Sequence, residues 1–310
     1  MFASSGTIVP ARVAKAFVLL LLASSAVMVI RTELLLKSKP SHRESTYRSL
    51  ESLSFKTKPF VAIVSCIKSK SDRVRHRPGE ILKERFLPSI RRTISVEELS
   101  QYRVEVILGY DEDDDYWQQH SNQDAVVAND NQIQQPIPVS FISLPKDDSR
   151  PNRIPFNELC KVAYDSGAKY LVRINDDTHF VTPGWLTLAI QTLQSFSPPN
   201  IGVVGPTCKG DASGEREILT HDMTYLPFHL SIFDTYYPQV FDNYYVDDWI
   251  SRVYGANRTK RLQDWEVVHD VEAYGTRYRP TFSQNQYLDE EVDAGKKRVE
   301  DFVNQKQGKR

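Results

Sequence analysis

Cysteine is scarce in this sequence, which has three, Cys66, Cys160 and Cys208, among 310 residues. An odd number of widely spaced cysteines is not the framework of a disulfide-stapled domain. One disulfide with a free thiol and three buried thiols are both compatible with the spacing. No C-x-x-C pair occurs, so the cysteine spacing alone predicts no metal site.

An excess of charge of either sign is also absent. The chain has 39 Lys and Arg against 40 Asp and Glu, a formal net charge of -1 at pH 7. Proteins that bind nucleic acid in bulk usually carry a strongly basic face, so this balance argues against a nucleic-acid partner. With 40% hydrophobic and 11% aromatic residues, the chain can bury one large core or two small ones.

Several motifs of common enzymes are missing. The sequence lacks G-x-x-x-x-G-K-[ST], G-x-G-x-x-G, H-E-x-x-H and G-x-S-x-G. The acidic run that begins at Asp111 is not an EF-hand loop, because its sixth and twelfth positions hold Tyr116 and Asn122 instead of Gly and Glu.

One apolar run stands near the N-terminus. Residues 16–30 carry no charge, and with Val13 and Ala14 they are long enough to span a membrane if Lys15 extends to the interface. A cleaved signal peptide is the alternative, because Ser24-Ser25-Ala26 offers small residues for cleavage. We expect the uncleaved anchor, since no clear polar cleavage region follows the run.

The anchor sets the expected domain organisation. We expect a cytosolic tail at 1–12, the anchor at 13–30, a stem or linker at 31–58, a globular domain at 59–280 and a charged tail at 281–310 that is a surface helix or disordered. The globular domain then lies in the lumen of the Golgi or endoplasmic reticulum, as in single-pass type II membrane proteins. The glycosylation sequon Asn257-Arg258-Thr259 agrees with a lumenal location.

Strands and helices alternate along the globular part. Apolar runs predict strands at 60–67, 102–110, 137–144 and 170–174, and helical periodicity predicts helices at 79–94 and 156–167. Residues 121–135, rich in Asn and Gln, are expected to form a surface loop. This order indicates an α/β domain with a mainly parallel sheet flanked by helices.

Adjacent carboxylates follow the strand that begins at Tyr170, in the sequence Asn175-Asp176-Asp177. Ligands of open α/β sheets bind beyond the carboxyl ends of the strands. One or two carboxylates at such a place can hold Mg²⁺ or Mn²⁺ together with phosphate oxygens. A solvated turn is the alternative, since Asp favours turns as well.

The order of these segments resembles glycosyltransferases of the GT-A fold, which is Rossmann-like. The resemblance covers roughly residues 60–278 and includes "LVRINDD", "PGWL" and "NIGVVGP". It implies an enzyme similar to glycosyltransferase family 2 that moves a sugar from a nucleotide sugar, with UDP-sugars favoured, to a glycan or glycoconjugate hydroxyl. Mn²⁺ or Mg²⁺ is the implied cofactor.

The same resemblance implies the metal ligands. Asn175-Asp176-Asp177 takes the place of the D-x-D motif, with Asn in the first position. Asp177 is then the direct metal ligand, Asp176 contacts ribose or metal, and Asn175 contributes a hydrogen bond. A late histidine completes the metal shell in several such enzymes, and His269 is the candidate, with His221-Asp222 as the alternative.

An acidic pair, Asp247-Asp248, stands before Trp249 and resembles the pair that inverting GT-A enzymes place at a helix start. A carboxylate there can take the proton of the attacking hydroxyl. The resemblance implies Asp248 as the base and leaves Asp247 to hold a hydroxyl. A simple helix cap is the alternative, because carboxylates are favourable at helix N-termini.

The first two strands supply the expected nucleotide contacts. By the same resemblance, Asp111 contacts the base or ribose, and Lys68 or Lys70 contacts phosphate; a solvated acidic loop is the alternative for the run after Asp111. Aromatic residues between Tyr225 and Trp249 are expected to lie mostly in the core. Two other functions stay open, a non-catalytic carbohydrate-binding protein and a nucleotidyltransferase.

Overall fold

The computed structural model describes residues 58–70, 77–128, 137–210, 218–270 and 278–308. The predicted membrane anchor at 13–30 lies outside these residues, as does the predicted stem apart from Lys58. Among the described residues, no helix is both long enough and apolar enough to span a bilayer. The chain from Lys58 onward forms one compact unit.

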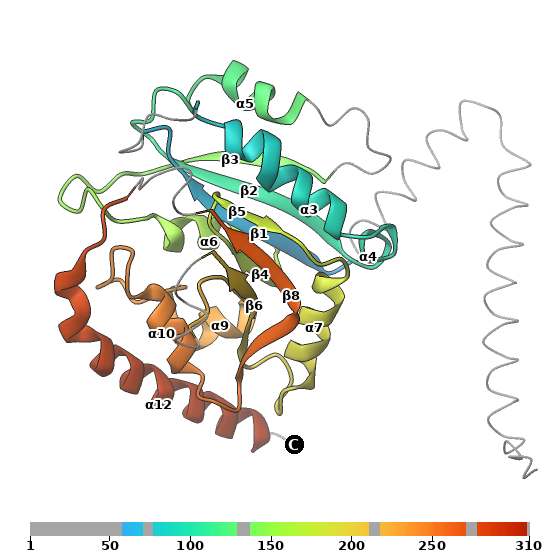
Figure 1. Ribbon diagram of the computed structural model, residues 1–310. Coiled ribbons are helices and arrows are strands. Elements are labelled where there is room, and N and C mark those ends of the chain that lie inside the picture. The colour runs from blue at the N-terminus through green and yellow to red at the C-terminus, as the bar shows by residue number, and fades with distance from the viewer. Residues whose placement is uncertain (1–57, 71–76, 129–136, 211–217, 271–277, 309–310) are drawn as a thin grey trace, which may run out of the picture. The chain divides into compact units, whose positions relative to one another are not determined.

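The described residues form an eight-stranded sheet in the order β3-β2-β1-β4-β7-β6-β8-β5 (Figure 1). The strands are β1 Phe60–Ile67, β2 Arg103–Asp111, β3 Val139–Leu144, β4 Tyr170–Arg173, β5 Thr178–Phe180, β6 Val203–Lys209, β7 Asp222–Tyr225 and β8 Thr259–His269. Strands β3, β2, β1 and β4 are mutually parallel, as are β6 and β8. Strand β7 is antiparallel to both β4 and β6, and β5 is antiparallel to β8. The sheet is therefore mixed, and the predicted parallel order holds for its first four strands.

Helices cover both faces of the sheet. They are η1 Leu82–Phe86, α3 Leu87–Thr93, α4 Val96–Gln101, α5 His120–Val127, α6 Phe156–Asp165, α7 Trp185–Ser195, α9 Leu226–Phe233, α10 Val246–Val253, η3 Phe282–Tyr287 and α12 Leu288–Gln307. One core cluster joins the sheet to η1, α3 and α7, and the other joins it to α6, α9, α10 and α12. Strand β1 is buried along its whole length because it contributes alternate side chains to the two clusters.

The segment expected as a loop at 121–135 begins instead as a helix, α5. Its sequence has little apolar patterning, and Val126 is its buried residue. Side-chain amides hold the helix to the turn before it: Asn122 Nδ2 donates to the Tyr116 carbonyl at 2.8 Å, and Gln123 Nε2 donates to the Trp117 carbonyl at 2.6 Å. The prediction was wrong here because polar contacts, which leave no apolar period, stabilise this helix.

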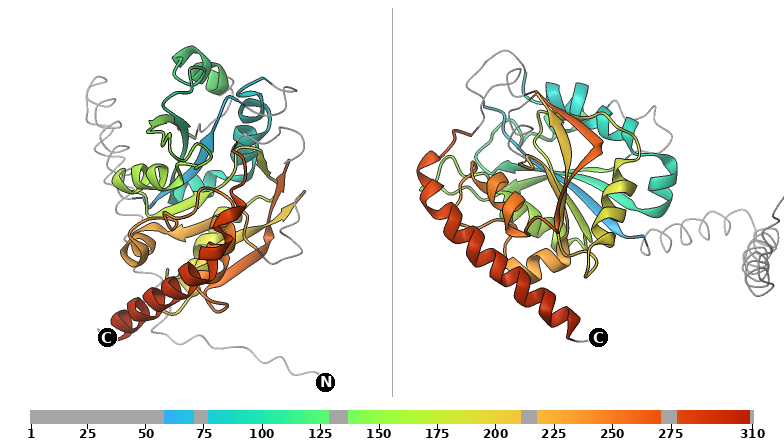
Figure 2. Two further views of the ribbon diagram at one scale, coloured as in Figure 1. Left: turned by 90° about the vertical axis from the view of Figure 1, so that its left-hand side faces the viewer. Right: turned by 60° about the horizontal axis from the view of Figure 1, so that its bottom comes forward.

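The charged C-terminal segment folds as the helix α12, one of the two forms expected for it. Leu288, Val292, Gly295 and Val299 are buried at helical spacing, and the charged residues occupy the remaining positions. Gly295 lets α12 approach α10 closely, since a Cβ there would lie 2.3 Å from Val253 Cγ2. Figure 2 shows α12 running along the domain beside α10. The segment is thus packed onto the core instead of trailing from it.

None of the three cysteines forms a disulfide, and all three are buried. The structure therefore selects three buried thiols over the alternative of one disulfide with a free thiol.

Candidate functional site

Asp177 and His269 lie side by side, although they are 92 residues apart in the sequence. The chain leaves β4 at Arg173 and enters β5 at Thr178, which pairs with His269 at the end of β8. This pairing brings His269 Nε2 to 2.9 Å from Asp177 Oδ1. Asn175 Nδ2 lies 3.4 Å from the same ring nitrogen. Both Asp177 and His269 are buried.

The donor atoms of this pair fit a divalent cation. Two ligands that are each about 2.1 Å from a cation and at right angles to one another lie about 3 Å apart, which agrees with the 2.9 Å between Asp177 Oδ1 and His269 Nε2. Carboxylate oxygen suits Mn²⁺ and Mg²⁺, whereas imidazole nitrogen suits transition metals. The pair therefore fits Mn²⁺ better than Mg²⁺, which prefers oxygen ligands.

Lys68, Asp111 and Tyr278 form a second group, here called the Lys68 cluster, at the carboxyl ends of β1 and β2. Lys68 Nζ lies 3.4 Å from Asp111 Oδ2 and 4.4 Å from the centre of the Tyr278 ring. The Tyr278 hydroxyl donates to Asp111 Oδ2 at 3.3 Å. Burial raises the pKa of Asp111, against the lowering effect of Lys68. The cluster thus presents a cation, a carboxylate and an aromatic ring together.

The charge of Asp176 affects Tyr278 of the Lys68 cluster. Burial first, and then the charges of Cys66, Asp111 and Asp176, raise the pKa of Tyr278 well above its ordinary value. The motif at the end of β4 is therefore divided, with Asp177 turned to His269 and Asp176 close enough to Tyr278 to affect its ionisation. Sequence reasoning did not select Tyr278, because a tyrosine beyond a long connection has no pattern that marks it.

The acidic run that begins at Asp111 has both buried and exposed members. Asp111 and Asp114 are buried, whereas Glu112, Asp113 and Asp115 are exposed. Asp114 Oδ2 accepts a hydrogen bond from the Ser69 backbone N–H at 2.7 Å, which holds the loop that carries Lys68. The alternative prediction of a solvated acidic loop thus holds for the exposed residues of the run. Lys70, the other candidate phosphate ligand, is exposed.

The acidic pair lies in the first turn of α10, where Asp247 forms an ion pair with Arg173. Arg173 comes from β4 and is buried. Its Nε donates to the Tyr237 hydroxyl at 2.7 Å and to Asp222 Oδ2 at 3.2 Å, and its Nη1 donates to the Thr220 carbonyl at 2.7 Å. This network fixes the start of α10 against the end of β4.

The two acids of the pair have different surroundings. Burial raises the pKa of Asp247 to about 6, against the lowering effect of Arg173. Asp247 and Asp248 are both half-buried. A carboxylate at either position suits the helix N-terminus, and Asp247 also forms the ion pair with Arg173.

Contacts of Arg173 and Asn175 link Asp247 of the acidic pair to His269 and Asp177. Arg173 Nη1 lies 3.5 Å from Asn175 Oδ1, and Asn175 in turn lies beside His269. The structure thus connects four of the predicted site residues, Asp247, Asn175, His269 and Asp177, through Arg173, which was not predicted. The alternative metal ligands, His221 and Asp222, lie in different surroundings. Asp222 is fixed in the core by Arg173 and Tyr237, whereas the centre of the His221 ring lies 5.3 Å from that of the His269 ring.

The aromatic segment lies mostly in the core, as expected. Tyr236, Tyr237, Phe241 and Trp249 are buried. Tyr244 is 37% exposed, and its ring packs 4.8 Å from that of Phe282, which is 60% exposed. This pair is the exposed aromatic surface nearest in sequence to Asp247 and Asp248.

Comparisons with known proteins found structures but no sequence family. No protein-family model matches this chain, and no curated protein matches it. Residues 1–349 of S. aureus TarS in complex with UDP align over 80% of this chain and 70% of theirs, with 12% identity and a TM-score of 0.48. The complex of the same protein with UDP-GlcNAc aligns over 79% and 72%, with 14% identity and a TM-score of 0.47. HddC from Yersinia pseudotuberculosis aligns over 68% and 93%, with 14% identity and a TM-score of 0.39. These values describe a likeness in chain arrangement and no more.

Proposed function

We propose that this protein is a metal-dependent, inverting glycosyltransferase that moves a sugar from a nucleotide sugar to a hydroxyl of a glycan or glycoconjugate. A UDP-sugar is the favoured donor, and the enzyme falls in the EC 2.4 class. One observation carries the proposal: Asp177, directly before β5, and His269, at the end of β8, hold a carboxylate oxygen and an imidazole nitrogen 2.9 Å apart at the carboxyl edge of the sheet. Such an edge is where open α/β sheets bind ligands.

This pair and the residues around it would contact different parts of the nucleotide-sugar donor. Asp177 and His269 would hold Mn²⁺, which offsets the negative charge of the departing diphosphate. Lys68 supplies a further positive charge for phosphate, and Asp111 with Tyr278 offers a hydrogen-bonding carboxylate and a ring to the nucleoside. Asp176, which is close enough to Tyr278 to affect its pKa, would contact ribose or the metal.

The acidic pair acts on the acceptor. Asp248 takes the proton of the attacking hydroxyl, which a positioned carboxylate can do during the displacement. Asp247 is held by Arg173 and therefore serves as a fixed support at the start of α10. Tyr244 and Phe282 offer an exposed apolar surface on which an acceptor sugar can rest.

Calorimetry with UDP, in the presence and absence of Mn²⁺, tests the proposal. We expect the folded Asp177→Ala variant to lose Mn²⁺-dependent UDP binding, because a hard cation needs the carboxylate. Asp165→Ala is the matched control, since Asp165 pairs with Lys161 on the exposed side of α6. Unchanged Mn²⁺-dependent affinity in Asp177→Ala would remove the proposed ligand. A preference for nucleoside triphosphates over nucleotide sugars would favour a nucleotidyltransferase instead.

A further inference from the structure

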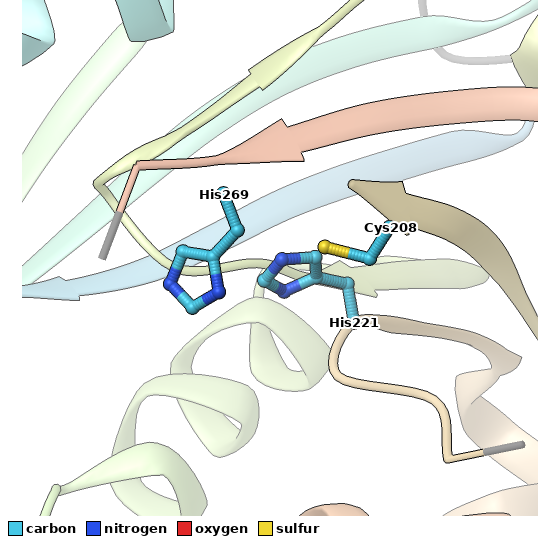
Figure 3. A group of neighbouring side chains, drawn as sticks. All are labelled: Cys208, His221 and His269. Carbon is cyan, nitrogen blue, oxygen red and sulfur yellow. The ribbon is translucent and has the colours of Figure 1, made fainter. Parts of the chain in front are cut away.

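Three side chains with nitrogen and sulfur donors meet beside the proposed donor site. Cys208 lies near the end of β6, His221 directly before β7 and His269 at the end of β8, and these strands are neighbours in the sheet. Their donor atoms all lie within 4.8 Å of one another, and all three residues are buried. Figure 3 shows the Cys208 sulfur directed at the His221 ring, with the His269 ring on the other side of it.

Two glycines of the β6 region make room for the two histidines. A Cβ at Gly205 would lie 2.4 Å from the His221 carbonyl oxygen. A Cβ at Gly210 would lie 2.5 Å from the His269 carbonyl oxygen, and Gly210 also has a φ of +89°. Both distances are far below ordinary van der Waals contact, so any other residue at either position would displace the backbone that carries a histidine.

Each histidine has an outer partner on its Nε2 atom. His221 Nε2 lies 3.1 Å from Thr178 Oγ1, and His269 Nε2 lies 2.9 Å from Asp177 Oδ1. Histidines that bind metals commonly use one ring nitrogen for the metal and hold the other N–H with a carboxylate or another acceptor. In Figure 3 His269 turns one ring nitrogen toward His221 and the other away from it. We therefore assign Nδ1 of each ring to the cation and Nε2 to the outer partner.

We propose that Cys208, His221 and His269 form a binding site for a transition cation of the Zn²⁺ class. One thiolate and two imidazole nitrogens are a common donor set for Zn²⁺, which binds such ligands in tetrahedral sites and can keep water as a fourth ligand. Mg²⁺ and Mn²⁺ prefer oxygen donors, so a site with a thiolate ligand disfavours them. On binding, the Cys208 thiol gives its proton to solvent.

This second cation site competes with the first. When a Zn²⁺ ion is bound by His269 Nδ1, the proton stays on His269 Nε2, which donates it in a hydrogen bond to Asp177 Oδ1. Neither His269 Nε2 nor Asp177 Oδ1 is then available to Mn²⁺. This consequence rests on the proposed function, whereas the Zn²⁺ site itself does not. We expect saturating Zn²⁺ to weaken Mn²⁺-dependent UDP binding at least tenfold, and we expect chelation of Zn²⁺ to restore it.

Titration of the metal-free full-length chain with Co²⁺ tests the site without any substrate. We expect one Co²⁺ per chain, a thiolate-to-Co²⁺ charge-transfer band in the near ultraviolet, and loss of that band when Zn²⁺ is added. Cys208→Ala should lose the band, whereas Cys160→Ala, which removes another buried thiol, should keep it. Asp177→Asn should keep the band with an affinity lowered by about 10- to 100-fold, as is usual for the partner of a ligating histidine.

The outcomes separate this proposal from the proposed function. A wild-type protein that binds Co²⁺ without a thiolate band, or that binds none, overturns the second site even if Cys208→Ala does not fold. A band that persists in folded Cys208→Ala overturns it as well. If the wild type shows no Mn²⁺-dependent UDP binding but does show the Co²⁺ band, the glycosyltransferase proposal is contradicted and the Zn²⁺ site is supported.

Discussion

Arg173 and Asp247 form an ion pair that ties the end of β4 to the first turn of α10 across 74 residues of sequence. The guanidinium is buried and also bonds Asp222 and Tyr237, so it is not free to move with a substrate. Because Asp247 is held by this ion pair, we propose Asp248 as the acid that takes the proton of an acceptor hydroxyl.

The first prediction concerns these two acids. Asp248→Asn should lower turnover by a factor of about 10²–10⁴, the usual effect of losing a positioned base. Donor affinity should stay nearly unchanged, because the base acts on the acceptor. Asp247→Asn should reduce turnover less. Turnover and donor affinity of both variants are the measurements, and normal turnover in Asp248→Asn, or a greater loss in Asp247→Asn, would show that the roles are assigned wrongly.

A second prediction follows from the environment of Asp247. Burial raises its pKa from 3.8 to about 6 in the folded protein. The folded chain then binds more protons than the unfolded chain between these two values, so the stabilising contribution is complete below about 3.8 and is lost as the pH rises through about 6. A shift of about two units corresponds to about 3 kcal/mol.

Urea unfolding of the wild type and Asp247→Asn, from about pH 4 to about pH 7, measures this contribution. The wild type should lose stability relative to the variant as the pH rises over that range, because asparagine does not titrate. Asp165→Asn serves as the control, since Asp165 is exposed on α6. A constant difference between wild type and Asp247→Asn across the range would contradict the raised pKa.

The sequence contains enough local signal to predict the first half of the sheet. Strand β1 was predicted with the bounds that the structure has, and the helices α3 and α6 lie within their predicted segments. These elements are long apolar runs or have clear helical periodicity. The antiparallel strands β5 and β7 were not predicted. They have three and four residues, too few for a period to be recognised.

Contacts between distant segments explain what the sequence could not predict at the site. Adjacent acids at a strand end marked Asp176 and Asp177, but nothing local shows that β5 pairs with β8 and so places His269 beside Asp177. The role of Arg173 was missed for the same reason, since its side-chain partners Asp222, Tyr237 and Asp247 are 49, 64 and 74 residues away. Cys208 could not be linked to His221 and His269 without the order of β7, β6 and β8.

A third prediction tests the Lys68 cluster. Lys68→Ala should weaken UDP binding by about 10- to 100-fold, because a hydrogen bond to a charged group contributes about 1.5–3 kcal/mol. Tyr278→Phe should have a smaller effect, since it keeps the ring and removes only the hydroxyl that donates to Asp111. Lys161→Ala, at an exposed position of α6, is the control. If Lys68→Ala and Lys161→Ala bind UDP equally well in calorimetry, the cluster is not a phosphate site.

A fourth prediction concerns the location of the domain. We propose that residues 13–30 form a membrane anchor and that the residues after it are lumenal, in the Golgi or endoplasmic reticulum. Asn257 is exposed in the turn between α10 and β8, so its side chain is accessible for modification. Glycosidase treatment of the protein from eukaryotic cells should cause a mass shift that Asn257→Gln removes. A C-terminus open to protease on the cytosolic side of intact vesicles would refute the topology.

The last prediction compares two glycines with nearly the same φ. Gly167 and Gly210 have φ values of +91° and +89°, so alanine at either position costs about 1–2 kcal/mol of backbone strain. No atom lies within 4 Å of a Cβ built at Gly167, whereas a Cβ at Gly210 meets the His269 carbonyl oxygen at 2.5 Å. Urea unfolding should therefore show a clearly larger loss of stability for Gly210→Ala than for Gly167→Ala. Folded Gly210→Ala should also bind UDP with Mn²⁺ more weakly, because His269 must shift, while Gly167→Ala should bind it normally. Equal losses of stability together with equal UDP affinities would mean that β6 does not position His269 in this way.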